Sequence, residues 1–141
     1  MYIDSDTLRS YFIEDGNTEV VKEILGKEKL ITSVISLEQL LADCEKNKKK
    51  MEIKQLEKLK RLQIVPLTKE IMKLALKLMR NYKISLHQGI HLATCIHYKE
   101  KMLSFNKKWD EMKEIERIDP LSLVGIEAKL GKGSVPFINR F

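Results

Sequence analysis

Four oxygen-bearing side chains occupy the same kind of position along this chain. Asp4, Glu38, Gln88 and Asn106 each lie just after a short apolar run or in the first turn of a predicted helix. In an open parallel sheet such positions meet at the carboxyl ends of the strands, where ligands bind. Four carboxylates there would hold a divalent cation for phosphodiester hydrolysis, because Mg²⁺ and Mn²⁺ prefer oxygen ligands and activate water against a phosphate. Here two of the four are acids and two are amides.

The elements that must position these side chains alternate between short apolar runs and helix-like stretches. This alternation predicts an α/β fold with a mostly parallel sheet. The predicted strands span 2–3, 30–35, 64–67, 102–105 and 115–118, and the predicted helices span 7–13, 18–25, 36–46, 46–61, 69–82, 85–98 and 107–113. Pro66 places its strand at a sheet edge or a strand end.

Several helix boundaries carry their own signals. Ser36 to Gln39 and Ser85 to Gln88 both have the form of a capping box, and Thr68 suits an N-cap. Gly26 is predicted to end the second helix in a left-handed conformation. The wide apolar arc of the helix at 69–82 predicts burial against both the sheet and another surface, such as a second subunit.

Length and composition indicate one globular domain. The chain has 141 residues, of which 43% are hydrophobic, so a disordered chain is excluded. Its formal charge of +6 favours polyanionic partners. Cys44 and Cys95 form no CxxC pair, which argues against a zinc knuckle or disulfide framework and suits the reducing cytoplasm. No apolar run is long enough for a membrane helix.

Lysines and the C-terminal composition give two further predictions. The candidate RNA-binding residues are Lys48, Lys49, Lys50, Lys107 and Lys108, although a basic helix face is also commonly just solvated. Glycines and a proline are enriched after Pro120. We therefore predict a domain over 1–120 and a C-terminal extension over 121–141.

Four segments, taken in order, resemble the PIN domain, the fold of VapC-type toxin ribonucleases. They are Tyr2-Ile3-Asp4-Ser5-Asp6, Thr32 to Leu41 with Glu38 at the second acid, Leu86 to Cys95 with Ala93-Thr94, and Leu103 to Trp109. The resemblance implies a three-layer α/β/α fold and an endoribonuclease that uses Mg²⁺ or Mn²⁺. It also implies an antitoxin-like protein partner, a homodimer and a cytoplasmic location.

The departures from this pattern weaken the expected site. Gln88 and Asn106 stand where the family has its third and fourth acids, so the four positions carry a formal charge of −2 instead of −4. An amide oxygen ligates a hard cation without supplying charge. We expect Asp4, Glu38 and Asn106 to hold one ion or none, and three functions remain open: an impaired or conditional ribonuclease, an inactive module that binds RNA or a protein, and a domain unrelated to nucleic acid.

Other residues have both a structural and a functional interpretation. Gln88 and Asn106 are also good capping residues, and Asp6 suits a cap for the first helix. The residues predicted to support the ligands are Ser5, Asp6, Ser104 and Asp110. His87 and His91 have zinc-compatible spacing but no third ligand, and Trp109 suits the core or stacking on a base.

Overall fold

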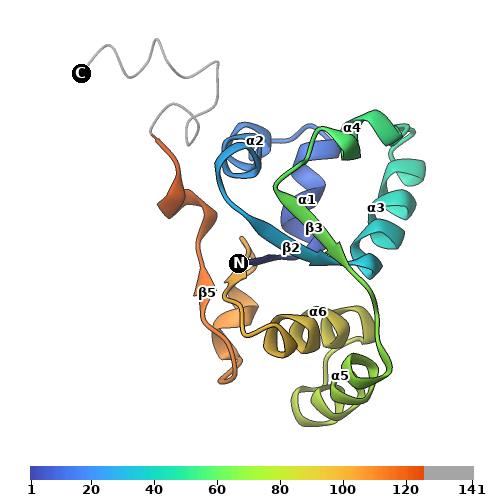
Figure 1. The fold of residues 1–141 in the computed structure, drawn as a ribbon, viewed down its shortest axis with the longest axis vertical. Helices are drawn as coiled ribbons and strands as arrows, with labels where there is room; N and C mark the ends of the chain where they lie inside the picture. Colours follow the sequence, from blue (N-terminus) through green and yellow to red (C-terminus); the bar gives the residue numbers. More distant parts are fainter. Residues whose placement is uncertain (126–141) are drawn as a thin grey trace.

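The computed structural model describes residues 1–125 and shows a five-stranded, all-parallel sheet at the centre of the molecule (Figure 1). The strands are β1 (Tyr2–Ile3), β2 (Leu30–Ser33), β3 (Leu62–Val65), β4 (Met102–Leu103) and β5 (Arg117–Ile118). Their order across the sheet is β3-β2-β1-β4-β5. The first strand in the sequence is therefore the central strand, and the predicted α/β fold is confirmed.

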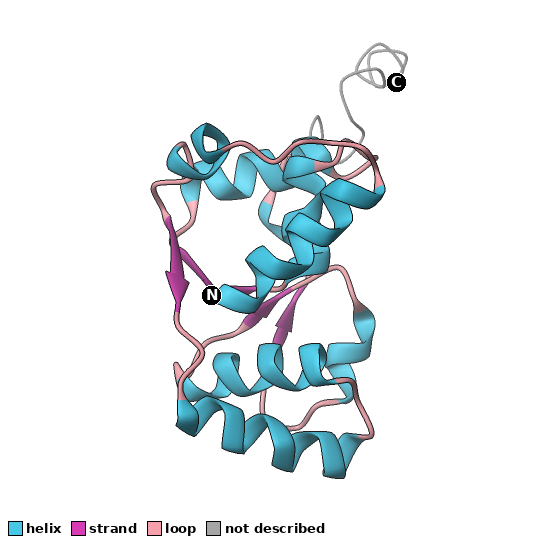
Figure 2. Ribbon diagram, turned by 90° about the vertical axis from the view of Figure 1, so that its right-hand side faces the viewer, coloured by secondary structure: helices cyan, strands magenta, loops and turns pink. Residues whose placement is uncertain are grey.

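Helices cover both faces of this sheet, which gives the predicted three layers (Figures 1 and 2). They are α1 (Ser5–Phe12), α2 (Thr18–Lys27), α3 (Val34–Lys46), α4 (Ile53–Glu57), α5 (Lys69–Tyr82) and α6 (Leu86–His97), with short 3₁₀ helices η1 (Lys107–Glu111) and η2 (Pro120–Leu123). α1 to α4 lie on one side of the sheet, and α6 lies on the other with α5 beyond it.

Each face of the sheet has its own hydrophobic core. Ile3 and Leu103 pack with α1, α2 and α3 on one face, whereas Tyr2 and Met102 pack with α5 and α6 on the other. Successive residues of a strand point to opposite faces, so two-residue strands suffice to join both cores. The complete burial of these four side chains fixes the centre of the sheet.

Parallel pairing brings the carboxyl ends of the strands to one edge of the sheet. Tyr2 pairs with Ile31 on one side and with Met102 on the other. The residues that follow β1, β2 and β4 therefore meet at this edge, which we call the carboxyl edge. The opposite edge, where the strands begin, is the amino edge.

The strand that ends near Pro66 is an edge strand, as predicted, because β3 pairs only with β2. It runs two residues earlier than expected, since Leu62 and Gln63 pair with Leu30 and Ile31. Pro66 follows the last paired residue, where its missing N–H costs no ladder hydrogen bond.

Several predicted boundaries are wrong. The first helix starts at Ser5 and is capped by Asp4, so Asp6 lies in its first turn and is not its cap. The second strand ends at Ser33, whose side chain caps α3 by accepting from the Ile35 amide, so α3 starts before Ser36. Ser36 instead lies buried within the helix and shares a 2.7 Å hydrogen bond with Thr32. Likewise, α2 continues through Gly26 to Lys27 and ends in an extended residue, without a left-handed glycine.

The predicted helix at 46–61 is reduced to the single short α4. Asn47 ends α3 and Lys48 adopts a left-handed backbone with φ of 55°. The Lys-rich segment before α4 has too few apolar residues to pack a continuous helix against the core, and tertiary packing provides most helical stability.

α5 has the predicted start, with the Thr68 side chain accepting from the Ile71 amide. It packs mainly on α6 (Figure 1), and its buried Ile71, Ala75 and Leu78 share a hydrophobic cluster with Tyr2 and Met102 of the sheet. Gly89 permits the close approach: a Cβ there would lie 3.1 Å from the Ala75 carbonyl oxygen and 2.9 Å from Met79 Cγ.

The last described segment, η2, packs against α2. Pro120 is buried, and Lys27 Nζ donates a hydrogen bond to the Leu123 carbonyl. The predicted domain boundary after residue 120 thus falls inside η2, and most of the predicted extension over 121–141 lies outside the described residues. Within residues 1–125, no helix combines the length and apolarity needed to cross a membrane.

Candidate functional site

Asp4 lies at the centre of the carboxyl edge, immediately after β1. Its side chain is 2% exposed, and both carboxylate oxygens accept hydrogen bonds from the protein. Oδ1 accepts from the Thr7 amide at 3.1 Å and so caps α1, while Oδ2 accepts from Ser104 Oγ at 2.7 Å and from Trp109 Nε1 at 3.0 Å. Three donors therefore stabilise the buried charge.

Ser104 connects this carboxylate to the loop after β4. Its hydroxyl donates to Asp4 and accepts from the Asn106 amide at 3.0 Å. Ser104 was predicted to support the ligands, and its contacts fit that role. Trp109 lies in the core, and its hydrogen bond to Asp4 has no signal in the sequence because the two residues are 105 positions apart.

A pocket of about 340 Å³ opens at this carboxyl edge; we call it the carboxyl-edge pocket. The start of α1, the second turn of α3, the start of α6 and the loop after β4 contribute its walls. The lining residues are Asp4, Ser5, Asp6, Gln39, Ser85, His87, Gln88, His91, Asn106 and Trp109. The structure therefore brings Asp4, Gln88 and Asn106 together, as the sequence predicts.

Glu38 lies outside this set. Its side chain is 63% exposed, and its Oε2 lies 3.1 Å from His87 Nε2. The neighbouring Gln39 lines the pocket in its place, and its Oε1 accepts from Ser5 Oγ and His91 Nε2, both at 2.7 Å. One residue along a helix turns the side chain by about 100°, so Gln39 faces the pocket and Glu38 does not.

His91 is a buried, neutral base of the pocket wall. The Tyr2 hydroxyl donates to its Nδ1 at 2.5 Å, which leaves the Nε2 proton for Gln39. Burial lowers the pKa of His91 to about 4, although the Asp4 charge opposes the shift. Burial likewise raises the pKa of Tyr2. The spacing of His87 and His91 therefore does not produce a zinc pair, since His91 has both nitrogens in use.

The two amides at the predicted acid positions serve as caps. Gln88 Oε1 accepts from the Ser85 amide at 3.1 Å while Ser85 Oγ accepts from the Gln88 amide, completing the predicted capping box. Asn106 Oδ1 accepts from the Lys108 amide at 3.0 Å at the start of η1. Both amides thus have a structural role at the mouth of the pocket.

The remaining acids are peripheral. Asp6 lines the pocket with an exposed side chain, and partial burial together with the charges of Asp4 and Asp43 raises its pKa. Asp110 does not line the pocket and forms an ion pair with Arg117 at 2.9 Å. Arg117 also donates to the Ser104 carbonyl, so Asp110 supports the loop after β4 indirectly, through Arg117.

These residues do not fit a strong divalent-metal centre. The acceptor oxygens that Asp4, Gln39, Gln88 and Asn106 bring to the pocket are each engaged by a protein donor. Among residues 1–125, no group of three His, Cys, Asp or Glu side chains has the geometry to hold a metal ion. A hard cation that gives up water needs charged oxygen ligands in return, and the floor of the pocket offers one carboxylate.

The predicted RNA-binding lysines fall into two separate groups. Lys107 and Lys108 are exposed on η1, directly after Asn106 at the carboxyl edge. Lys48, Lys49 and Lys50 follow the end of α3, whose 13 residues span about 20 Å away from that edge. Only the first group lies beside the pocket.

Parallel strands, two helical layers and polar residues gathered at the carboxyl edge define an α/β domain with a polar pocket beside its central strand. The chain belongs to the PIN domain family, which matches residues 1–115. PIN domains generally use divalent metal ions.

Solved structures of toxin–antitoxin proteins share the fold. A toxin–antitoxin complex from Klebsiella pneumoniae has a TM-score of 0.67 at 19% identity, covering 84% of this chain and 96% of that chain. VapC20 of Mycobacterium tuberculosis, described as a Sarcin-Ricin loop cleaving toxin, has a TM-score of 0.67 at 9% identity, covering 82% and 96%. VapBC2 from Rickettsia felis, bound to a DNA fragment from its promoter, has a TM-score of 0.62 at 12% identity, covering 83% and 96%. No curated protein sequence matches the chain.

Proposed function

We propose that this protein is a toxin-type PIN protein that binds single-stranded RNA at the carboxyl-edge pocket and has a strongly impaired metal-dependent endoribonuclease activity. One observation carries the proposal: the pocket combines a single buried carboxylate, Asp4, with the amides Gln39, Gln88 and Asn106. The amides keep the shape and hydrogen-bonding capacity of acids but remove their charge.

RNA binding is supported by the charge at the rim and the polarity of the walls. Lys107 and Lys108 are exposed beside Asn106 and form no ion pair among residues 1–125. Amide side chains such as Gln88 both donate and accept hydrogen bonds and so suit base edges. The Asp4 charge repels a phosphate, which places the backbone at the rim near the lysines and not at the pocket floor.

The first test is cleavage of single-stranded RNA in Mg²⁺ or Mn²⁺, with EDTA and Asp4→Ala as controls. We expect slow cleavage that needs the divalent metal and is lost both in EDTA and in Asp4→Ala. Rapid cleavage by the wild-type protein that is lost in both EDTA and Asp4→Ala would show that the activity is intact and would contradict the proposed impairment.

Restoring charge tests whether the missing acids are the cause. Gln39→Glu is isosteric and keeps both accepted hydrogen bonds, while Gln88→Asp and Asn106→Asp add two more carboxylates. The triple variant lowers the formal charge from +6 to +3 and should gain Mn²⁺ binding in calorimetry and RNA cleavage. Equal Mn²⁺ affinity in the variant and the wild-type protein would refute this explanation.

RNA binding itself is tested with a charge-matched pair of variants. Lys107→Gln/Lys108→Gln should weaken binding of a short oligonucleotide, of about 4 nucleotides, whereas Lys73→Gln/Lys77→Gln on α5 removes the same charge away from the pocket. Equal losses in the two variants would mean that net charge, and not this rim, attracts the RNA.

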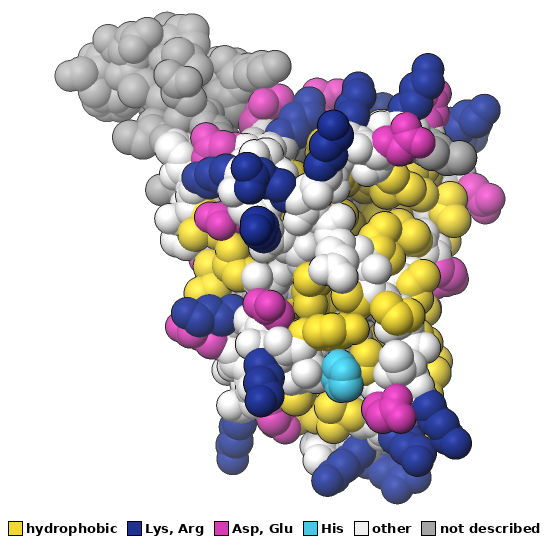
Figure 3. Space-filling view, viewed as in Figure 1, with side chains coloured by type: hydrophobic (Ala, Val, Ile, Leu, Met, Phe, Trp, Pro, Cys, Tyr) yellow, Lys and Arg dark blue, Asp and Glu magenta, His cyan; other side chains and the backbone are white. Residues whose placement is uncertain are grey.

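A protein partner is a second candidate, favoured by exposed hydrophobic side chains. These include Val34 and Leu41 of α3, Ile64 of β3 and Leu76 of α5, and hydrophobic side chains gather on the face shown in Figure 3. An antitoxin-like partner and a homodimer both suit such a surface. Light scattering should show a dimer that Leu41→Glu/Leu76→Glu converts to a monomer; a monomeric wild-type protein would leave the antitoxin-like partner as the candidate for this surface.

A further inference from the structure

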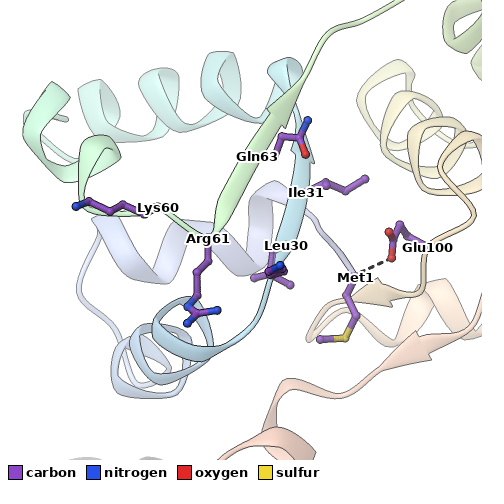
Figure 4. Close-up of a pocket in the computed structure, with 8 residues that line it drawn as sticks. Met1, Leu30, Ile31, Lys60, Arg61, Gln63 and Glu100 are labelled. Atoms are coloured by element: carbon purple, nitrogen blue, oxygen red, sulfur yellow. Dashed lines mark ion pairs between the residues drawn. The ribbon is translucent and has the colours of Figure 1, made fainter.

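A second pocket, of about 330 Å³, lies at the amino edge of the sheet (Figure 4). We call it the amino-edge pocket. Its lining residues are Met1, Lys29, Leu30, Ile31, Lys60, Arg61, Gln63 and Glu100. The PIN-type site at the carboxyl edge uses none of them.

The charge of this pocket is strongly positive. Lys29, Lys60 and Arg61 form no ion pair with any residue of 1–125. The only acid in the lining, Glu100, is already paired with the Met1 ammonium group at 3.0 Å, as the dashed line in Figure 4 marks. Three cations therefore face solvent with no counter-charge from the pocket.

Strand pairing forces two of these cations together. Leu30 of β2 pairs with Leu62 of β3, and the Leu30 amide donates to the Arg61 carbonyl at 2.9 Å. Lys29 and Arg61, one residue earlier on each strand, are therefore neighbours in the register. Like charges at facing strand positions are destabilising unless a counter-charge compensates them.

The chemistry of the lining selects a phosphate group as this counter-charge. A guanidinium group offers a planar fork of donors that matches phosphate oxygens, and ammonium groups add point charges. In Figure 4, Arg61 extends beside Leu30 and Lys60 extends outward from the rim, so the cations spread along a surface instead of enclosing a small ion. Such a spread suits several phosphates of a polymer.

We propose that the amino-edge pocket is a second RNA contact, in which Lys29, Lys60 and Arg61 bind backbone phosphates of a strand that also reaches the carboxyl-edge pocket. The inference rests on the proposed RNA-binding function. Lysine and arginine side chains are frequent over the upper part of the face in Figure 3. Because this contact lies at the opposite edge from Asp4, it binds RNA without recognising its bases and without cleaving it.

The test compares two RNA lengths, about 4 and about 16 nucleotides, across a range of salt concentrations. Lys29→Gln/Arg61→Gln removes two phosphate contacts, each contributing about 0.7 to the salt slope for single strands. The variant should therefore lose about 1.4 from the slope with the long RNA and bind it about 25-fold more weakly at about 0.1 M salt. Binding of the short RNA, which occupies the carboxyl-edge pocket alone, should be unchanged.

Lys73→Gln/Lys77→Gln is the matched control, because it removes the same charge from exposed positions of α5. Equal effects of the two double variants on the long RNA would overturn the inference. So would an unchanged salt slope in Lys29→Gln/Arg61→Gln, whose thermal unfolding verifies that it is folded. Calorimetry with inorganic phosphate distinguishes a free phosphate ion from RNA as the ligand. If the pocket binds inorganic phosphate, but the substitutions leave binding of the long RNA unchanged, the ligand is a free anion and the inference is overturned.

The two proposals fail in different ways. If Lys107→Gln/Lys108→Gln weakens the short RNA while Lys29→Gln/Arg61→Gln leaves the long RNA unaffected, the carboxyl-edge function stands and the amino-edge contact is refuted. If the wild-type protein binds neither RNA, the proposed function itself fails, and this inference fails with it.

Discussion

At the scale of single residues, the site depends on how one carboxylate is held. Asp4 is buried beneath two donors, Ser104 and Trp109, that arrive from the other end of the chain. The place of Asp4 at the carboxyl edge was predictable because the acid directly follows the first strand, but its role as the N-cap of α1 was not expected. The donors to Asp4 were not predictable, because a hydrogen bond between residues about 100 positions apart leaves no local pattern in the sequence.

Breaking the indole contact should destabilise the fold. Trp109→Phe removes the Nε1 donor from a buried carboxylate, and a hydrogen bond to a charged group contributes about 1.5–3 kcal/mol. A double-mutant cycle with Asp4→Ala, which removes the acceptor, isolates this interaction from the lost ring volume when it is measured by urea unfolding. We expect a coupling energy in that range, and additive effects of the two substitutions would contradict it.

His91 should make stability depend on pH. Its folded-state pKa of about 4 lies below the ordinary value of 6.5, so between these values the unfolded chain binds a proton that the folded protein excludes. Stability should therefore fall as the pH drops from about 6.5 towards 4, by up to about 1.4 kcal/mol for each pH unit.

His91→Gln can still accept from Tyr2 and donate to Gln39, but it does not titrate. Urea unfolding at several pH values should show a flatter profile for this variant, while the exposed His97→Gln keeps the wild-type slope. If the stability of His91→Gln falls with pH as steeply as that of the wild-type protein, the pH dependence comes from carboxylates and not from His91.

At the scale of elements, helix starts decide which side chains enter the site. Thr68 and the capping box of Ser85 and Gln88 were predictable because short-range hydrogen bonds specify them. The start of α3 was not: Val34 and Ile35 favour a strand by their side-chain shape, yet tertiary packing places them in the helix. Within this helix Gln39 lines the pocket and Glu38 does not, which its sequence pattern did not show.

Two glycines within helices should respond oppositely to alanine. Gly89→Ala would press a Cβ against Met79 and the Ala75 carbonyl, so overpacking between α5 and α6 should outweigh the gain in helix propensity and lower the stability by about 1 kcal/mol. A Cβ added at Gly26 would meet no neighbouring element within 4 Å, so Gly26→Ala should stabilise α2 by up to about 1 kcal/mol. Thermal unfolding of both variants tests these two predictions. A higher unfolding temperature for Gly89→Ala would mean that α5 and α6 can move apart at no cost and would contradict the expected overpacking.

At the scale of the whole molecule, the sheet has polar sites at its two edges. Composition alone predicted a polyanionic partner, but charge counting could not show that Lys29 and Arg61 gather at one edge while Lys107 and Lys108 lie at the other. The five-strand order follows from alternation and parallel pairing, whereas the position of β1 at the centre depends on long-range contacts that periodicity does not report.

The described C-terminal segment should contribute to stability. A chain ending at Gly125 keeps η2, with buried Pro120 and the bond from Lys27 to Leu123, whereas a chain ending at Asp119 loses both. We expect the longer of these two chains to unfold at a higher temperature. Equal unfolding temperatures would show that η2 rests on α2 without stabilising it.

The central position of β1 has a consequence for synthesis on the ribosome. Tyr2 and Ile3 pair in β4 with Met102 and Leu103, which are synthesised about 100 residues later. Such non-local pairing is slow and leaves apolar surface exposed in partly made chains. Because Ser104 and Trp109 are synthesised later still, the nascent chain cannot assemble its buried carboxylate, and with it the carboxyl-edge pocket, until both residues have been made.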